Sequence, residues 1–138
     1  MIFRARQKTL PTTRQIIVEN NALEQVDNIK FLGVYIDQHL RWKTHANFFA
    51  AKISKSVGLL YKAKCYLPSK SLLTLYYALI YPHLTYCNLI WASTYVTNMQ
   101  RIYLLQKRAV QAISKADYKA SSKPLFPNLK ILDVFSIY

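Results

Sequence analysis

The acidic side chains decide whether the chain could carry out nucleotidyl transfer, because that reaction needs two or more carboxylates that converge on a metal ion. The chain carries only six acids, and they are Glu19, Glu24, Asp27, Asp37, Asp117 and Asp133. No two of them form a D-x-D, D-D or E-x-x-H pattern. A hydrolase would need a nucleophile with a base in reach, and no motif indicates that pairing either. We therefore expect no catalytic residue and no metal ligand in this chain.

Two histidines and two cysteines are the remaining candidates for metal chemistry. His39 and His45 stand six residues apart across a predicted strand-to-helix turn, and no cysteine stands at ligand spacing from them. A surface or capping role is therefore favoured over a metal pair. Cys65 and Cys87 form no C-x-x-C pattern, which supports neither a disulfide framework nor a zinc site. We expect an intracellular chain, in the cytoplasm or the nucleus.

Positive charge is the strongest signal in the composition. Nineteen Lys and Arg against six Asp and Glu give a formal net charge of +13, which attracts nucleic acid and anionic lipid headgroups alike. Residues 41–116 contain no Asp or Glu, so their cations have no acidic partner within the helices. An ordinary solvated helix face is the alternative for any single lysine. The candidates for phosphate contacts are Lys52, Lys55, Lys62, Lys64, Arg101, Lys107, Arg108 and Lys115.

Aromatic residues are also abundant, with eleven Tyr, six Phe and two Trp. Flat, partly polar rings can stack on nucleobases. Rings also dominate the buried area of protein cores. We expect a core position for most of them.

A charge-free block lies between Lys70 and Arg101. Its 21 residues from Leu72 to Ala92 are long enough to span a bilayer. Pro82 divides the segment into two short pieces, and polar groups and tyrosines are scattered through its middle. We therefore expect a helical core or interface and no membrane span.

The first forty residues predict a small sheet fragment. Its expected strands are Met1–Ala5, Arg14–Glu19, Ala22–Val26 and Lys30–Asp37. Asn20–Asn21 is the predicted hairpin turn, because Asn tolerates positive φ. Gly33 suggests a bulge or a close backbone approach inside the last strand.

After Trp42 the apolar period changes from two to 3.6, which predicts helices. The first helix runs from an N-cap at Thr44 to about Tyr66, with Phe49, Ile53, Val57, Leu60 and Tyr61 on one face. Ser69 is the predicted cap of a second helix that ends at Pro82, and His83–Trp91 continues after the kink. We expect His83 to be a hydrogen-bonded core residue.

The third long helix is predicted from Thr97 or Asn98 to about Ala116. Its inward stripe is Met99, Ile102, Tyr103, Gln106, Ala109, Val110 and Ile113. Arg101, Arg108 and Lys115 follow at seven-residue intervals and predict one outward basic face, which Lys107 extends. A loop over Asp117–Asn128 and a helix that starts at Leu129 complete the chain.

These elements predict an α+β fold that is mostly α. A short antiparallel hairpin or three-strand fragment over residues 1–40 precedes a helical bundle over residues 41–138.

The order of motifs resembles the C-terminal part of the reverse transcriptase of non-LTR (LINE-type) retrotransposons. The matching runs are MIF, IIVENNALEQVDNIKFLGVYID, W-K-x-H at Trp42–His45, KISKSVGLLYKAKCYLP, LLTLYYALIYPHLTYCNLIWAS and RIYLLQKRAVQAIS. The resemblance covers the whole chain. KFLGVYID and LIYPHLTYCNLIWAS are its most specific pieces.

The resemblance implies that residues 1–40 are the last strands of a polymerase palm and residues 41–138 a thumb-like domain. Phe31, Leu32 and Gly33 would form a primer grip, and the basic helices would hold the template–primer duplex, RNA:DNA or DNA, without reading its sequence. The family's catalytic carboxylates belong to a Y/F-A-D-D motif that this chain does not contain. Magnesium would bind in that missing part of the palm, so we expect no polymerase activity from this chain alone.

Two other interpretations stay open. The chain could be a small basic helical protein that docks its apolar block onto a partner or a membrane. It could also be the product of a truncated element with no role of its own. Under the leading interpretation its partners are nucleic acid and the missing palm and fingers.

Overall fold

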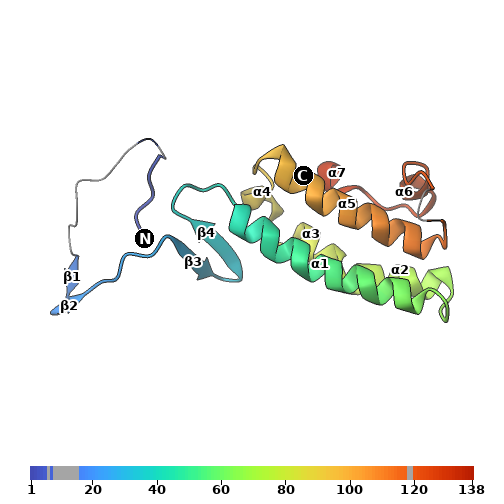
Figure 1. Cartoon of the computed structure of the whole chain (residues 1–138), viewed down its shortest axis with the longest axis horizontal. Coiled ribbons are helices and arrows are strands. Elements are labelled where there is room, and N and C mark those ends of the chain that lie inside the picture. The colour runs from blue at the N-terminus through green and yellow to red at the C-terminus, as the bar shows by residue number, and fades with distance from the viewer. Residues whose placement is uncertain (6, 8–15, 118–119) are drawn as a thin grey trace. The chain divides into compact units, whose positions relative to one another are not determined.

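The computed structural model describes residues 1–5, 7, 16–117 and 120–138, and it has two compact units, Met1–His45 and Ala46–Tyr138 (Figure 1). The first unit holds two antiparallel strand pairs, and the second is helical. The predicted α+β, mostly α class is therefore confirmed. The assignment of residues 1–40 and 41–138 to a palm and a thumb stays a prediction.

The first strand pair consists of β1 (Ile17–Val18) and β2 (Asn21–Ala22). Val18 pairs with Asn21, so the turn residues are Glu19 and Asn20, with φ of 48° and 64°. Two successive positive φ values are typical of the type I′ turn that closes tight hairpins. The turn therefore lies one residue before the predicted Asn20–Asn21.

The second pair is β3 (Asn28–Phe31) and β4 (Val34–Asp37), joined by Leu32 and Gly33 with φ of 46° and 81°. Phe31 pairs with Val34 and Asn28 with Asp37. The prediction of one strand over Lys30–Asp37 was wrong, because the chain reverses direction at Leu32–Gly33. A glycine accepts positive φ without steric cost, and here it serves a tight turn instead of a bulge.

The other sheet predictions need two corrections. Met1–Ala5 is not a strand, although the Arg4 amide N–H donates to the Gln38 carbonyl over 3.0 Å. Of the strand predicted over Ala22–Val26, only Ala22 belongs to a strand. Residues 14 and 15 of the predicted second strand lie outside the described residues. The described part of the first unit therefore contains two separate ribbons and no three-stranded sheet.

The Asp37 carboxylate organises the entry into α1 (Lys43–Ala63). It accepts hydrogen bonds from the backbone N–H groups of His39, Arg41 and Trp42 at 3.0, 3.0 and 2.8 Å. Trp42 has a φ of 60°, and the helix starts at the next residue. Thr44 was the predicted N-cap, but it lies inside the helix.

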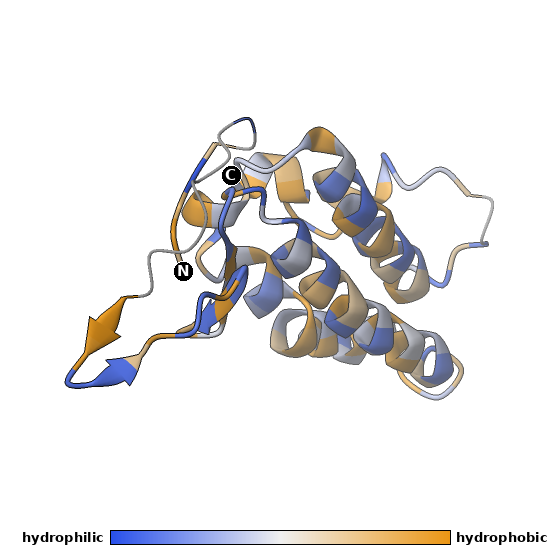
Figure 2. Cartoon of the chain, turned by 60° about the vertical axis from the view of Figure 1, so that its left-hand side comes forward, coloured by the Kyte–Doolittle hydropathy of each residue, from blue (hydrophilic) through white to orange (hydrophobic). Residues whose placement is uncertain are grey.

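The second unit packs α1, α2 (Ser69–Leu79) and α5 (Val96–Ile113) around one core. Most of the predicted apolar stripes are confirmed: Ile53 and Leu60 of α1 and Ile102 and Val110 of α5 are fully buried, whereas Tyr61 and Tyr103 are half-buried. Figure 2 shows hydrophilic and hydrophobic residues alternating along these helices, as amphipathic helices require. The core is completed from the charge-free block by Leu72, Tyr76, Ile80, Leu84 and Trp91.

The charge-free block holds most of α2, all of α3 (Tyr81–Thr85) and α4 (Asn88–Trp91), and the first residues of α5. Pro68 occupies the N-cap position of α2, so Ser69 is not the cap. Cys87 has a φ of 52° and divides the predicted His83–Trp91 helix. In the part of the chain that the structure describes, no helix has the length and apolar character needed to cross a membrane.

The third long helix, α5, starts at Val96 after an N-cap at Tyr95, two or three residues before the predicted caps Thr97 and Asn98. It ends at Ile113, where Lys115 has a φ of 54°. The Ala116 amide donates to the Gln111 carbonyl and the Lys115 amide to the Ala112 carbonyl, the two bonds of a Schellman C-cap.

The C-terminal segment contains α6 (Leu125–Asn128) and α7 (Val134–Ile137) in place of the helix predicted from Leu129. Lys130, in a left-handed conformation with a φ of 54°, lies between the two helices. The Asp133 carboxylate then caps α7 by accepting the Ser136 N–H over 2.8 Å.

Gln106 ties this segment to the bundle. Its fully buried amide donates to the Tyr76 hydroxyl over 2.8 Å and to the Leu132 carbonyl over 2.9 Å. Its carbonyl oxygen accepts the Val134 N–H over 2.8 Å. Burial raises the pKa of Tyr76 to about 12, so this hydroxyl stays protonated in the network.

Candidate functional site

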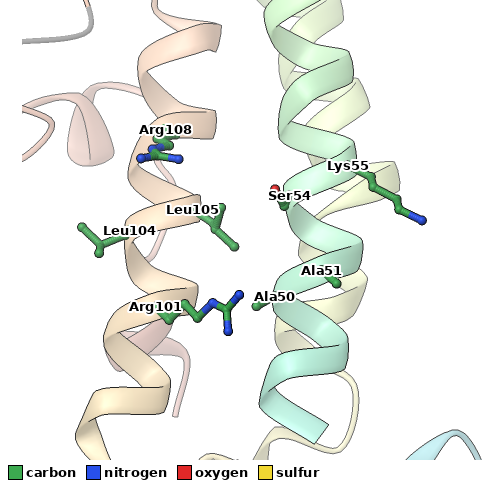
Figure 3. Close-up of a pocket in the computed structure, with 8 residues that line it drawn as sticks. All are labelled: Ala50, Ala51, Ser54, Lys55, Arg101, Leu104, Leu105 and Arg108. Carbon is green, nitrogen blue, oxygen red and sulfur yellow. The ribbon is translucent and has the colours of Figure 1, made fainter. Parts of the chain in front are cut away.

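A groove between α1 and α5 is a concave surface of the helical unit. The two helices lie side by side and run in the same direction (Figure 1). A cavity of about 540 Å³ opens between them. It is lined by Ala50, Ala51, Ser54 and Lys55 of α1 and by Arg101, Leu104, Leu105 and Arg108 of α5 (Figure 3).

A second cavity of about 380 Å³ continues the groove toward the end of α1. Both cavities share Ser54, Leu105 and Arg108, and the second adds Val57, Gly58 and Tyr61. We call the two together the α1–α5 groove.

Small side chains on α1 create the space. Ala50, Ser54 and Gly58 follow at four-residue intervals, which places them on one face of the helix. A Cβ atom added at Gly58 would meet no heavy atom within 4 Å. The floor of the groove is therefore open enough for a ligand to approach the helix backbone.

Two arginines of α5 border the groove. Arg101 and Arg108 are both exposed, and seven residues of helix separate them by about 10.5 Å along the axis. The Arg101 Nη1 atom donates to the Asn47 Oδ1 atom of α1 over 2.8 Å. Figure 3 shows the Arg101 side chain reaching toward α1 and Lys55 extending away from α5. The arginines therefore supply the charge beside the opening, and Lys55 supplies charge on the outer side of α1.

The remaining predicted cations lie elsewhere on the second unit. The Lys52 ammonium is 4.6 Å from the Phe48 ring centroid. Its charge adds to burial in lowering the pKa of His83, which places Lys52 toward α3 and not in the groove. Lys62 is exposed and does not line either cavity.

Two predictions about the basic face of α5 were wrong. Lys107 lies over the Tyr103 ring at 5.5 Å, and Tyr103 stacks on Phe126, so Lys107 extends toward the C-terminal segment. Lys115 follows the helix end in a left-handed conformation and cannot continue a helical face. Of the three spaced cations, only Arg101 and Arg108 share a helical face.

Lys64 follows the end of α1. Its ammonium lies 4.9 Å from the centroid of Tyr61, a ring that lines the second cavity. The contacts of all eight predicted cations with nucleic acid stay predictions.

The predicted primer-grip residues belong to the first unit. Phe31 ends β3, and Leu32 and Gly33 form the hairpin turn. Phe31 and Leu32 are 60% and 75% exposed, so both apolar side chains are open to contact. Their role in holding a primer stays a prediction.

The three histidines pack against or bond to neighbouring protein groups. His39 shares a hydrogen bond of 2.9 Å with the Arg4 carbonyl through Nδ1, and the buried His45 accepts the Tyr35 N–H over 3.2 Å. Burial lowers the pKa of His45 to about 4, so it is neutral near pH 7. His83 is half-buried against the Phe49 ring and does not lie deep in the core as predicted. Among the described residues, no group of three or more His, Cys, Asp and Glu is arranged to hold a metal.

The sequence reasoning missed Ala50, Ser54 and Gly58 as groove residues. Their signal is the four-residue spacing of small side chains along α1. Tyr61 was predicted on the buried face, but it is only half-buried and lines the second cavity.

Comparisons with known proteins add a relationship in sequence. No family model matches the chain. No solved structure matches it. Two curated proteins of Drosophila melanogaster do match. A probable RNA-directed DNA polymerase from transposon X-element is 25% identical over 137 residues, which cover 96% of this chain and 15% of the relative. A probable RNA-directed DNA polymerase from transposon BS is 29% identical over 131 residues, which cover 90% of this chain and 14% of the relative.

The chain thus spans about one seventh of the length of these relatives. The similarity supports a relationship between this chain and a segment of the RNA-directed DNA polymerases that transposons encode.

Proposed function

We propose that the chain is a segment of a retrotransposon reverse transcriptase, and that its α1–α5 groove holds the template–primer duplex by its phosphates. The observation that carries the proposal is the pair Arg101 and Arg108 at the edge of an open groove, within a stretch free of acids. The sequence similarity to transposon polymerases supports the same function.

The geometry suits contacts to a phosphate backbone. Arginine pairs with phosphate through two parallel N–H bonds. The separation of about 10.5 Å between Arg101 and Arg108 corresponds to roughly three nucleotides at about 3.4 Å of axial rise per nucleotide. Contacts of this kind fix the position of the nucleic acid and carry no sequence information.

The finer placement is part of the proposal. The second unit would act as the thumb, and the first unit would supply the end of the palm, with Phe31, Leu32 and Gly33 near the primer. The carboxylates and the magnesium ions of polymerisation would come from other parts of the polymerase. The site of action would be inside the cell, in the cytoplasm or the nucleus.

Fluorescence anisotropy of a labelled RNA:DNA duplex between 50 and 500 mM salt tests the proposal. Binding should weaken steeply with salt, and Arg101→Ala and Arg108→Ala should each reduce the slope of log K against log salt by about one. Lys70→Ala is the matched control, because Lys70 is exposed on α2 and lines neither cavity.

Salt-independent binding, or equal slopes for all three variants, would contradict a phosphate-binding groove. The alternative of a membrane-associated basic protein makes a different prediction. It requires binding to anionic vesicles that survives when Arg101 and Arg108 are both replaced.

A further inference from the structure

Tyr61 gives one end of the α1–α5 groove a different chemistry from the other. The half of the groove beside Arg101 is lined by aliphatic and small residues and by Lys55, Arg101 and Arg108, with no aromatic ring. The cavity at the other half is bordered by the Tyr61 ring together with Gly58 and Arg108. An aromatic wall and a cation are thus combined at one place.

There is room for a flat group beside this ring. Gly58 and Tyr61 are three residues apart on α1, so they are neighbours on one face of the helix. No heavy atom lies within 4 Å of a Cβ built at Gly58. The cavity of about 380 Å³ falls in the size range of small-ligand sites, roughly 300–1,000 Å³.

The charges around the ring select an anionic ligand. The Lys64 ammonium lies 4.9 Å from the ring centroid, and Arg108 lines the same cavity. No acid occurs between residues 41 and 116. A ligand with a flat aromatic part and a negative linker matches both features.

We propose that this end of the groove binds one unpaired nucleotide, with its base against the Tyr61 ring and a phosphate beside Arg108. The proposal rests on the proposed function and refines it. A base inside a duplex is stacked on both sides and offers no face to a side chain, whereas an unpaired base does. The groove therefore recognises a junction, with duplex near Arg101 and a single strand at Tyr61.

The test compares three ligands bound to the full 138-residue chain by anisotropy at one salt concentration: a blunt duplex, the same duplex with a three-nucleotide overhang, and that overhang with abasic sites. The 5′ and 3′ overhangs are measured separately. At least one overhang should bind roughly 5- to 100-fold more tightly than the blunt duplex, as expected for one stacked base. The abasic overhang should lose this gain.

Substitutions at two positions, Tyr61 and Gly58, test the site independently. Tyr61→Ala should abolish the preference for the overhang, and Tyr61→Phe should retain it because the ring remains. Gly58→Leu should abolish it by filling the open space, and Gly58→Ala is the matched control with a much smaller side chain. Circular dichroism of each variant confirms that the helices are intact.

Equal affinity for blunt and overhanging duplexes would overturn the inference, as would a preference that survives both Tyr61→Ala and Gly58→Leu. These outcomes are distinct from a failure of the proposed function. If Arg101→Ala and Arg108→Ala weaken binding of the blunt duplex while Tyr61→Ala changes no ligand's affinity, only the junction proposal is wrong.

Discussion

Replacing Gln106 with leucine should be among the most destabilising single changes in the helical unit. Leucine keeps much of the side-chain volume but removes the amide that joins three partners. The Tyr76 hydroxyl and the Val134 N–H lose bonds that are fully buried, and the Leu132 carbonyl loses one that is partly buried. The bundle would keep its packing and lose the polar link to its C-terminal segment.

The magnitude follows from the cost of leaving buried polar groups without partners. Each fully buried group costs about 1–3 kcal/mol, and the partly buried carbonyl costs less because water can reach it. We expect Gln106→Leu to lower the free energy of unfolding by about 4 kcal/mol. That is a large share of the roughly 5–15 kcal/mol that stabilises a typical domain.

Urea denaturation followed by far-UV circular dichroism measures this loss. Tyr76→Phe alone should cost about 1 kcal/mol, because it removes one bond and takes its own polar group away. The double variant should lose less free energy of unfolding than the two single variants lose together. With Phe at position 76, Gln106→Leu no longer leaves a buried hydroxyl without a partner. A loss below about 1 kcal/mol for Gln106→Leu, with the Val134 amide still protected from hydrogen exchange, would refute the reasoning.

Three further predictions concern pH, helix propensity and salt. Burial lowers the pKa of His45 in the folded chain to about 4 from 6.5, so the unfolded chain binds a proton at a higher pH than the folded chain does. The free energy of unfolding should therefore fall as the pH drops from 6.5 to 4, by at most about 3 kcal/mol. The urea midpoint of His45→Gln should lack this fall. Gly58→Ala should raise the free energy of unfolding by about 0.5–1 kcal/mol, measured as a higher urea midpoint, because a Cβ there meets nothing. Raising NaCl from 0.05 to 0.5 M should raise the melting temperature while it weakens duplex binding, because the same screening reduces repulsion within the acid-free bundle; a melting temperature that falls with salt would contradict this.

The sequence predicted which residues of a helix are buried, because this depends on the period of apolar residues along that helix. Ile53, Leu60, Ile102 and Val110 repeat with the helical period, and all four are fully buried. The turn at Leu32–Gly33 was missed because KFLGVYID is rich in strand-forming residues throughout, and Leu rarely takes positive φ.

Helix starts were the least predictable feature. Thr44, Ser69 and Thr97 are residue types that favour N-caps, yet each lies inside its helix in the structure. At α1 Trp42 has positive φ and its N–H donates to the Asp37 carboxylate, and the helix starts at Lys43, two residues before the start that an N-cap at Thr44 predicts. The bonds to Asp37 set this boundary, and the cap preference of Thr44 did not.

The groove could not be predicted because it depends on which faces of two helices oppose each other. Asn47 and Arg101 are 54 residues apart in sequence and meet through one hydrogen bond of 2.8 Å. Nothing in either helix alone indicates this pairing. The sequence supplied the charges, and the packing decided which of them converge.

The charge-free block explains how a bundle with so unbalanced a charge stays folded. Between residues 46 and 116 there is no acid, so the cations of this stretch repel one another. Tyr76, Ile80 and Trp91 are fully buried and supply apolar burial that offsets this repulsion. The inward faces of α1 and α5 complete this core with Ile53, Leu60, Ile102 and Val110, while the surfaces that line the groove carry small residues and arginines. The apolar core therefore stabilises a bundle whose groove concentrates positive charge.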